Sequence, residues 1–116
     1  MKNIQKISLD YKGKKFNFDA KICRFFDTIL GLMFKSRKNA QALLFKFDKP
    51  SRITIHSLFV FFPFVVVWLD NKGKVIVIRK VKPFTPIVSI EKSYSRIIEI
   101  PINKKYSDII KFLVGD

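Results

Sequence analysis

The sequence predicts an α+β fold, mainly β: a compact, mostly antiparallel β domain, barrel-like or sandwich-like, with two short helices. Three observations predict it. Residues 15–22 alternate between apolar and polar side chains, which is typical of a half-buried strand. Asp-Asn-Lys-Gly at 70–73 is the strongest hairpin signal, because its glycine can adopt a left-handed backbone. The apolar run Leu58 to Leu69 is twelve residues long and is interrupted by Pro63, whereas a membrane-spanning helix needs about 20 apolar residues.

This central stretch, which we take as residues 53–70, is expected to form two strands, at about 53–60 and 64–69. Pro63 marks a bend, bulge or edge between them, because proline cannot donate a hydrogen bond to a sheet. Apolar residues at consecutive positions indicate that both faces of the strand are covered. We therefore place Phe64, Val66 and Trp68 in the core or in a subunit contact. A re-entrant or interfacial membrane segment is the alternative.

The remaining elements follow from periodicity and turn residues. A helix near 24–31 is indicated by apolar residues spaced three and four apart, and Asn103 can begin a C-terminal helix near 104–112. Glycine and proline mark turns and rigid loops at 11–14, 48–51 and 82–86. The other expected strands are residues 4–10, 42–47, 75–78 and 94–100.

Length and composition indicate one globular domain, residues 1–116. The chain is 48% hydrophobic and 15% aromatic, which excludes a disordered chain. Its net charge of +14 arises from 23 Lys and Arg against nine acids, and such a charge attracts polyanions. Because these cations are spread through most segments, we interpret them first as a solvated basic surface. Weak binding of polyanions is expected from charge alone.

The N-terminal residues bear on the cellular location of the protein, and the number of cysteines bears on disulfide and zinc chemistry. The first residues hold no apolar stretch typical of a signal peptide, so we expect a cytoplasmic protein, although a chain trimmed of its leader would look the same. We expect no transmembrane segment. The single Cys23 excludes an intrachain disulfide and a cysteine zinc site.

Several motifs resemble one family. Residues 31–37, Gly-Leu-Met-Phe-Lys-Ser-Arg, are similar to the Gly-Leu-Met-Phe-Arg signature of DUF192, a domain family of unknown function. Further stretches resemble its archaeal branch in matching order: Ile55-His56-Ser57, Phe62-Pro63, Val66 to Asp70, Lys82-Pro83-Phe84, Arg96 to Pro101 and Val114-Gly115-Asp116. The resemblance covers about residues 22–116. It implies a compact, mostly antiparallel β domain with small helices, and it supplies no activity.

The sequence departs from this family at two positions. Phe61 stands where the archaeal branch tends to carry a basic residue, and Val65 stands where the family usually has Asp. If those two residues formed a functional polar pair, it is missing here. Either that site has degenerated, or the region from Phe61 to Val65 has become a contact face, for a protein partner or for a homodimer.

Few residues of the sequence are candidates for catalysis or for metal binding. His56 is the only side chain that ordinarily titrates near neutral pH, and we interpret it as a packed strand residue before a catalytic base. One His, one Cys and acids that lie mostly in turns do not form a metal-ligand set or a close carboxylate pair. None of the four glycines belongs to a phosphate-binding motif. We therefore predict no catalytic residue, no metal and no cofactor.

Three classes of function remain, and we rank them. The first is a non-enzymatic binding or interaction module, the second is non-specific nucleic-acid binding through the basic surface, and the third is an enzyme of unrecognised type around His56 and Arg37. The sequence leaves enzymatic activity open, and we favour its absence. The residues that we predict for ligand binding are Arg37, His56, Phe59, Lys82 and Phe84.

Overall fold

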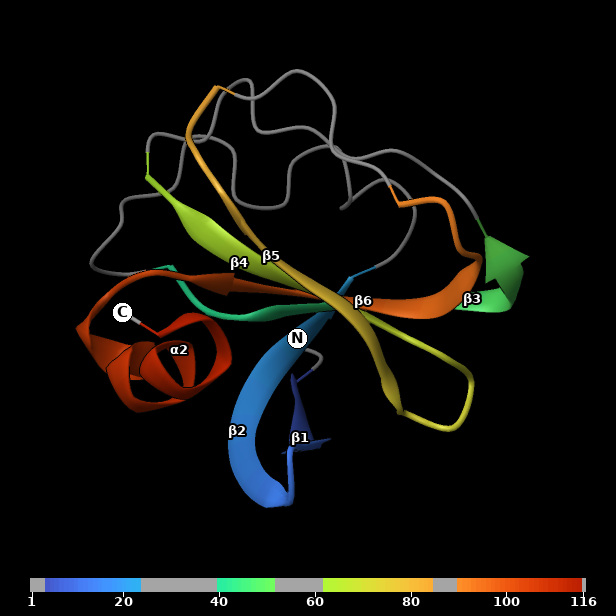
Figure 1. Ribbon diagram of the computed structural model, residues 1–116, viewed down its shortest axis with the longest axis horizontal. Coiled ribbons are helices and arrows are strands. Elements are labelled where there is room, and N and C mark those ends of the chain that lie inside the picture. The colour runs from blue at the N-terminus through green and yellow to red at the C-terminus, as the bar shows by residue number, and fades with distance from the viewer. Residues whose placement is uncertain (1–3, 24–39, 52–61, 85–89, 116) are drawn as a thin grey trace.

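The computed structural model describes residues 4–23, 40–51, 62–84 and 90–115, which form six strands and a C-terminal helical segment (Figure 1). The strands are β1 (Ile4–Tyr11), β2 (Lys14–Cys23), β3 (Leu43–Ser51), β4 (Phe64–Leu69), β5 (Val75–Val81) and β6 (Tyr94–Pro101). A 3-10 turn, η1 (Lys104–Tyr106), leads into the helix α2 (Ser107–Val114). The mainly β fold and the C-terminal helix are confirmed. The helix predicted near 24–31 and the strand predicted at 53–60 lie outside the described residues.

The six strands form one mixed sheet in the order β1-β2-β3-β6-β4-β5. It curls into a half-barrel, with the β1–β2 hairpin turned away from the central strands (Figure 1). All neighbouring strands are antiparallel except β2 and β3, which run parallel from the pair Lys21–Leu43 to the pair Cys23–Phe45. A parallel neighbour requires a long crossover, and the chain between β2 and β3 supplies that length.

Both predicted hairpins are present, and their turns are set by residues that adopt a left-handed backbone. Lys12 (φ +50°) and Gly13 (φ +77°) join β1 to β2. In the turn between β4 and β5, Gly73 has φ +85°. There the Asp70 carboxylate accepts hydrogen bonds from the backbone N–H groups of Lys72 and Lys74, each at 2.8 Å. The hydrogen bond from Lys74 is the main reason why the pKa of Asp70 is lowered.

The turn predicted at 48–51 is wrong, because β3 continues through these residues to Ser51. The register between β3 and β6 shifts there: four residues of β3, between Lys46 and Ser51, stand opposite the single residue Ser95 of β6. Such a bulge leaves residues out of the hydrogen-bond ladder, so it can accommodate Pro50, which has no N–H. The Pro and polar residues that indicated a turn form an irregular strand.

Strand β4 lies in the core along its whole length, and its side chains alternate between two faces. We call them the Trp68 face and the α2 face, after the residue and the helix that mark them. Buried residues of the Trp68 face are Ala40, Leu43, Phe45, Phe62, Phe64, Val66, Trp68, Val81, Ile90, Tyr94 and Ile97. Those of the α2 face are Ile7, Leu9, Ala20, Ala42, Leu44, Val65, Val67, Leu69, Ile98, Ile100, Tyr106, Ile109, Ile110 and Leu113. Cover on both faces of this strand is confirmed, and each buried large apolar side chain contributes about 1.5–3 kcal/mol.

The contact face predicted at Phe61 to Val65 is not supported by the residues described there. Phe62, Phe64 and Val65 are each at most 2% exposed, because β4 begins at Phe64 between two other strands. These side chains belong to the chain's own core and are not available to a protein partner or to a second copy. Phe61 lies outside the described residues.

The α2 face is closed by the C-terminal segment. Apolar residues recur along one side of α2, so that Ile109, Ile110 and Leu113 are buried against the sheet. The Tyr106 hydroxyl accepts a hydrogen bond from the Ala42 N–H at 2.7 Å, which ties the start of α2 to the start of β3. In the described parts of the chain, no helix has the length and apolar character to cross a membrane.

Candidate functional site

The Trp68 face carries a carboxyl group within an apolar layer. Glu99 lies on β6 opposite Leu43 of β3 and Val66 of β4, and only 8% of its surface is exposed. Removal from water raises the pKa of Glu99 to about 8, from an ordinary value of 4.5. At neutral pH this group is therefore mostly protonated, so that it can donate a hydrogen bond as well as accept one.

The indole of Trp68 is the second buried polar group on this face. Trp68 is opposite Ile97 of β6, and its neighbour on the same side of β4, Val66, is opposite Glu99. Trp68 and Glu99 are thus diagonal neighbours, for which a Cα separation of about 7–8 Å is typical. The indole N–H is buried and has no acceptor among the described residues. Buried indole N–H groups usually find a partner, so this arrangement sets the Trp68 face apart from an ordinary apolar core.

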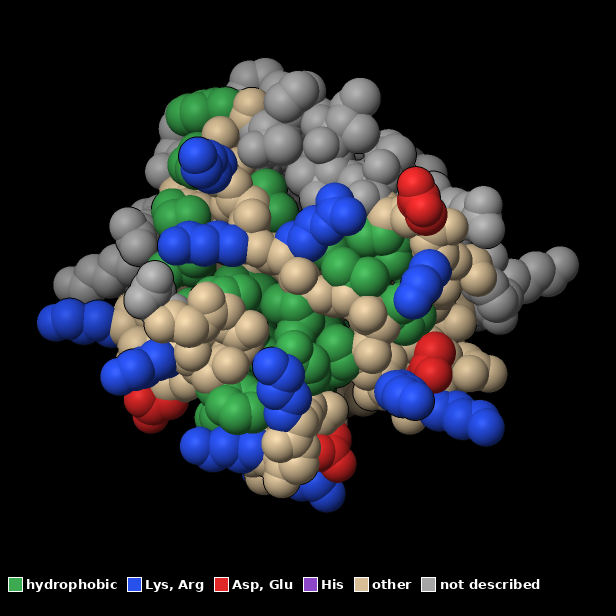
Figure 2. Space-filling model, viewed as in Figure 1, with side chains coloured by type: hydrophobic (Ala, Val, Ile, Leu, Met, Phe, Trp, Pro, Cys, Tyr) green, Lys and Arg blue, Asp and Glu red, His purple; other side chains and the backbone are tan. Residues whose placement is uncertain are grey.

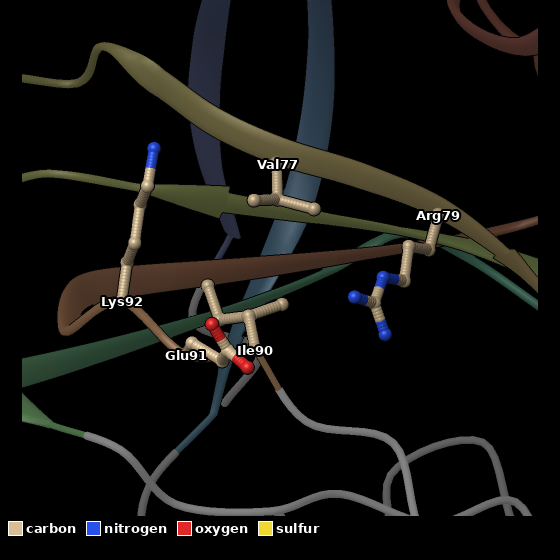
Figure 3. Close-up of a pocket in the computed structure, with 5 residues that line it drawn as sticks. All are labelled: Val77, Arg79, Ile90, Glu91 and Lys92. Atoms are coloured by element: carbon tan, nitrogen blue, oxygen red, sulfur yellow. The ribbon is translucent and has the colours of Figure 1, made fainter.

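A hollow of about 410 Å³ opens at the β5 margin of the Trp68 face, lined by Val77, Arg79, Ile90, Glu91 and Lys92 (Figure 3). In the close-up, Val77 and Ile90 face one another across the middle, while Arg79 and Lys92 extend on either side. Val77 and Arg79 are exposed to the hollow because β5 is the last strand of the sheet. The volume lies within the range of about 300–1,000 Å³ that is typical of small-molecule sites.

Strand register connects the hollow with the buried carboxyl. Val77 is opposite Trp68, and Arg79 is opposite Val66, which in turn is opposite Glu99. Arg79 and Glu99 therefore share one cross-strand row on the same face, separated by the width of two strand spacings, about 10 Å. The row places a cation at the margin of the sheet and a protonated carboxyl at its centre.

The side chains that line the hollow are suited to binding a charged group. Two cations beside two apolar side chains suit an anionic group that carries an apolar part. Glu91 is the carboxylate that lines the hollow, and it limits the net charge there. Within the described ranges there is no cluster of His, Cys, Asp and Glu side chains able to hold a metal ion.

The structure describes two of the five residues predicted for ligand binding. Lys82 and Phe84 directly follow β5, and both are exposed, Phe84 to 53%. Neither lines the hollow. Phe84 has φ +61°, a left-handed conformation that costs a residue with a side chain about 1–3 kcal/mol. Arg37, His56 and Phe59 lie outside the described residues, so the geometry predicted around His56 and Arg37 stays a prediction.

Sequence reasoning missed Glu99 and Arg79. It placed the acids mostly in turns, whereas Glu99 lies in the middle of a buried strand. A signal was present, because Glu99 is a lone acid between Ile98 and Ile100 in an apolar run. For Arg79 there was no comparable signal: its relation to Trp68 and Glu99 depends on which strands are neighbours.

By its fold and its hollow, the protein is a small domain with one curled β sheet and an open hollow of ligand size at one margin of that sheet. The model of the DUF192 family, described as "Uncharacterized ACR", matches residues 8–108, and the chain belongs to this family. No curated protein matches the chain.

Two solved structures are similar in fold. A protein of unknown function from Novosphingobium aromaticivorans has a TM-score of 0.76 and 14% identity, and the match covers 91% of this chain and 78% of that one. A protein from Sinorhizobium meliloti, described as "a putative transcription regulator", has a TM-score of 0.75 and 12% identity, with 94% and 86% covered. At these identities the likeness concerns the fold alone.

Proposed function

We propose that this protein is a non-enzymatic binding module and that its ligand site is the hollow lined by Val77, Arg79, Ile90, Glu91 and Lys92. The observation that carries the proposal is the combination in one hollow of two exposed cations with Val77 and Ile90 between them. The ligand class that fits is a small organic anion with an apolar part, such as a monocarboxylate. The guanidinium of Arg79 suits a carboxylate because its planar N–H groups match the two oxygens.

The charge around this margin supports an anionic ligand. The exposed cations on β5, in its turn and beside the hollow are Lys72, Lys74, Arg79, Lys80, Lys82 and Lys92. The acids in the same segments are Asp70 and Glu91. Low-dielectric walls beside a cluster of one sign of charge raise the local concentration of the opposite ion.

The test is calorimetric titration with hexanoate, with hexanol as the uncharged match. We expect hexanoate to bind and hexanol to bind much more weakly. Arg79→Gln should weaken hexanoate binding by about 10-fold or more, since it removes charged hydrogen bonds. The control is Lys80→Gln, which removes the same charge from the adjacent exposed residue on the other side of β5. Equal affinities of the two variants, or no binding of hexanoate to the wild type, would contradict the proposal.

The second candidate function is non-specific binding of nucleic acid, favoured by the net charge of +14. In Figure 2, Lys and Arg side chains are spread over the described part of the visible face instead of gathering in one patch. This distribution supports diffuse, salt-sensitive attraction. For binding that rests on diffuse charge alone, the expected result is loss by about 150 mM salt, where the screening length is about 8 Å.

Other predictions stay open to experiment. The sequence motifs at Ile55-His56-Ser57 and at Val66 to Asp70 support membership of an archaeal branch of the family, which we propose on that basis. The cytoplasmic location is also proposed, and cell fractionation is its test. The enzyme hypothesis around His56 and Arg37 requires these two side chains to approach one another, and a crystal structure that separates them would exclude it.

A further inference from the structure

The β1–β2 hairpin packs against α2 through three aromatic rings. The rings of Phe16 and Phe112 are 5.0 Å apart between centroids, tilted at 42°, and Tyr11 meets Phe112 edge-on at 5.9 Å. All three rings are half-buried: their inner sides pack on the α2 face, and part of each remains accessible. This position on the opposite face of the sheet separates them from the hollow.

Two exposed lysines lie over these rings. Lys14 Nζ is 5.2 Å from the centroid of Phe16 and 5.4 Å from that of Phe112, and Lys12 Nζ is 5.4 Å from that of Tyr11. We call the five residues the hairpin–helix patch. A cation–π contact at an exposed site is weak, so an ammonium group can move to a phosphate without a large loss. Without a ligand, the ammonium groups of Lys12 and Lys14 lie over the rings.

The surroundings of the patch are basic. Exposed lysines nearby on the hairpin, η1 and α2 are Lys15, Lys104, Lys105 and Lys111. The exposed acids on the hairpin and α2 are Asp10, Asp19 and Asp108. In the hairpin ladder, Asp10 stands directly opposite Lys15, and Asp19 opposite Lys6. Figure 2 shows hydrophobic and basic side chains side by side, with some acidic ones among them, at the end of the molecule where Figure 1 places the hairpin and α2.

We propose that the hairpin–helix patch binds single-stranded nucleic acid, with Lys12 and Lys14 on phosphates and a base stacked against Phe16 or Tyr11. Rings and ammonium groups about 5 Å apart present the two complements of a nucleotide, a flat π surface and a cation. A single strand fits because its bases are free to stack, whereas a duplex hides their faces. An acidic protein would use the lysines but would leave the rings without a matching partner.

The experiment measures anisotropy of a labelled oligothymidine 15-mer with the full chain, from 50 to 200 mM salt. Lys14→Gln should lower the slope of log K against log salt by about 0.7, the value for one lost phosphate contact on a single strand. The matched control is Lys92→Gln, an exposed lysine beside the hollow that removes the same charge. An equal change of slope in both variants would mean that the charge is diffuse, and would overturn the proposal.

A second variant tests the stacked base. Phe16→Leu keeps an apolar side chain against Phe112 and removes the flat ring, so we expect oligothymidine to bind about 5-fold more weakly or worse. Thermal melting of the variant shows whether it is folded, and Lys14→Gln tests the patch without touching the core. Equal affinity for duplex DNA or for heparin at matched charge would also overturn the proposal. Hexanoate binding at the hollow is measured separately and is expected to be unchanged in Lys14→Gln and in Phe16→Leu.

Discussion

The two faces of β4 are built from alternate residues of one six-residue strand, yet they differ in whether their buried polar groups have hydrogen-bond partners. On the α2 face, the buried hydroxyl of Tyr106 has a partner at 2.7 Å, the Ala42 N–H. On the Trp68 face, the indole N–H of Trp68 has no acceptor among the described residues, and Glu99 is buried between Leu43 and Val66. The Trp68 face therefore retains buried polar groups, and the other buried polar atom without a partner among the described residues is the side-chain oxygen of Asn103, directly before η1.

That difference indicates where to look for function. A buried polar group without a partner costs about 1–3 kcal/mol, which apolar packing alone does not require. Places where a fold tolerates such costs are often functional. The hollow opens on the Trp68 face, and β4 lies between its Arg79 and Glu99. The face with these buried polar groups is therefore also the face with a hollow of ligand size.

The largest effect is expected from Trp68→Ala. It removes a fully buried indole, and the free energy of unfolding should fall by about 3–5 kcal/mol. Trp68→Phe removes the indole N–H but retains an aromatic ring, so its loss should be smaller. Urea denaturation measures both. If the Ala variant unfolds at the wild-type midpoint, Trp68 does not hold the face together.

The next largest effect is expected from Glu99, and it depends on pH. The pKa of Glu99 is about 8 in the folded chain against 4.5 ordinarily, so between these values the folded state holds a proton that the unfolded state has released. The contribution of this group is therefore full below about pH 4.5, declines as pH rises, and is lost above about pH 8, by a few kcal/mol in total. Melting curves of Glu99→Gln should lack this decline. Parallel pH profiles of variant and wild type would show that the carboxyl is solvated.

A smaller effect is expected on the α2 face. Tyr106→Phe leaves the buried N–H of Ala42 without an acceptor, and the free energy of unfolding should fall by about 1–3 kcal/mol. Chemical denaturation gives the value, and Tyr11→Phe serves as a control on a half-buried ring. A neutral Tyr106→Phe substitution would mean that the two faces do not differ in the way described above.

The smallest effect on the fold is expected from Asp70, in the turn between β4 and β5, which belongs to neither face. Asp70→Ala removes the carboxylate that accepts the N–H groups of Lys72 and Lys74, so these two amides should exchange with deuterium faster. The pKa of Asp70 is lowered in the fold, so its contribution is present above about pH 4 and is lost as pH falls through the lowered pKa. Hydrogen exchange measured by NMR checks it. Unchanged exchange at both amides would exclude the capping role.

Local patterns in the sequence predicted the local parts of the fold. Both hairpin turns, the bounds of β4 and the cover on both its faces follow from Gly13, Gly73 and the run from Phe64 to Leu69. The parallel pairing of β2 with β3 could not be predicted, because nothing near either strand encodes a distant neighbour. At Pro50 the same residues suit a turn or a bulge, and only the pairing with β6 decides between them.

The candidate site was less predictable for the same reason. Lys82 and Phe84 are adjacent to β5 in sequence, so their position followed from the loop itself. The row Arg79–Val66–Glu99 joins three strands that are neighbours only because β4 lies between β5 and β6. A cation, a valine and an acid at these positions carry no pattern until the register is known.

The place of β6 in the sheet has a consequence for synthesis of the chain. Of the six described strands it is made last, and it pairs with both β3 and β4. Until it emerges, the described strands made earlier form two separate pieces without a shared edge, and β4 lacks one of its two neighbouring strands. Exposed apolar surface and unpaired strand edges favour aggregation. We therefore expect the nascent chain to be most prone to aggregation before β6 is complete.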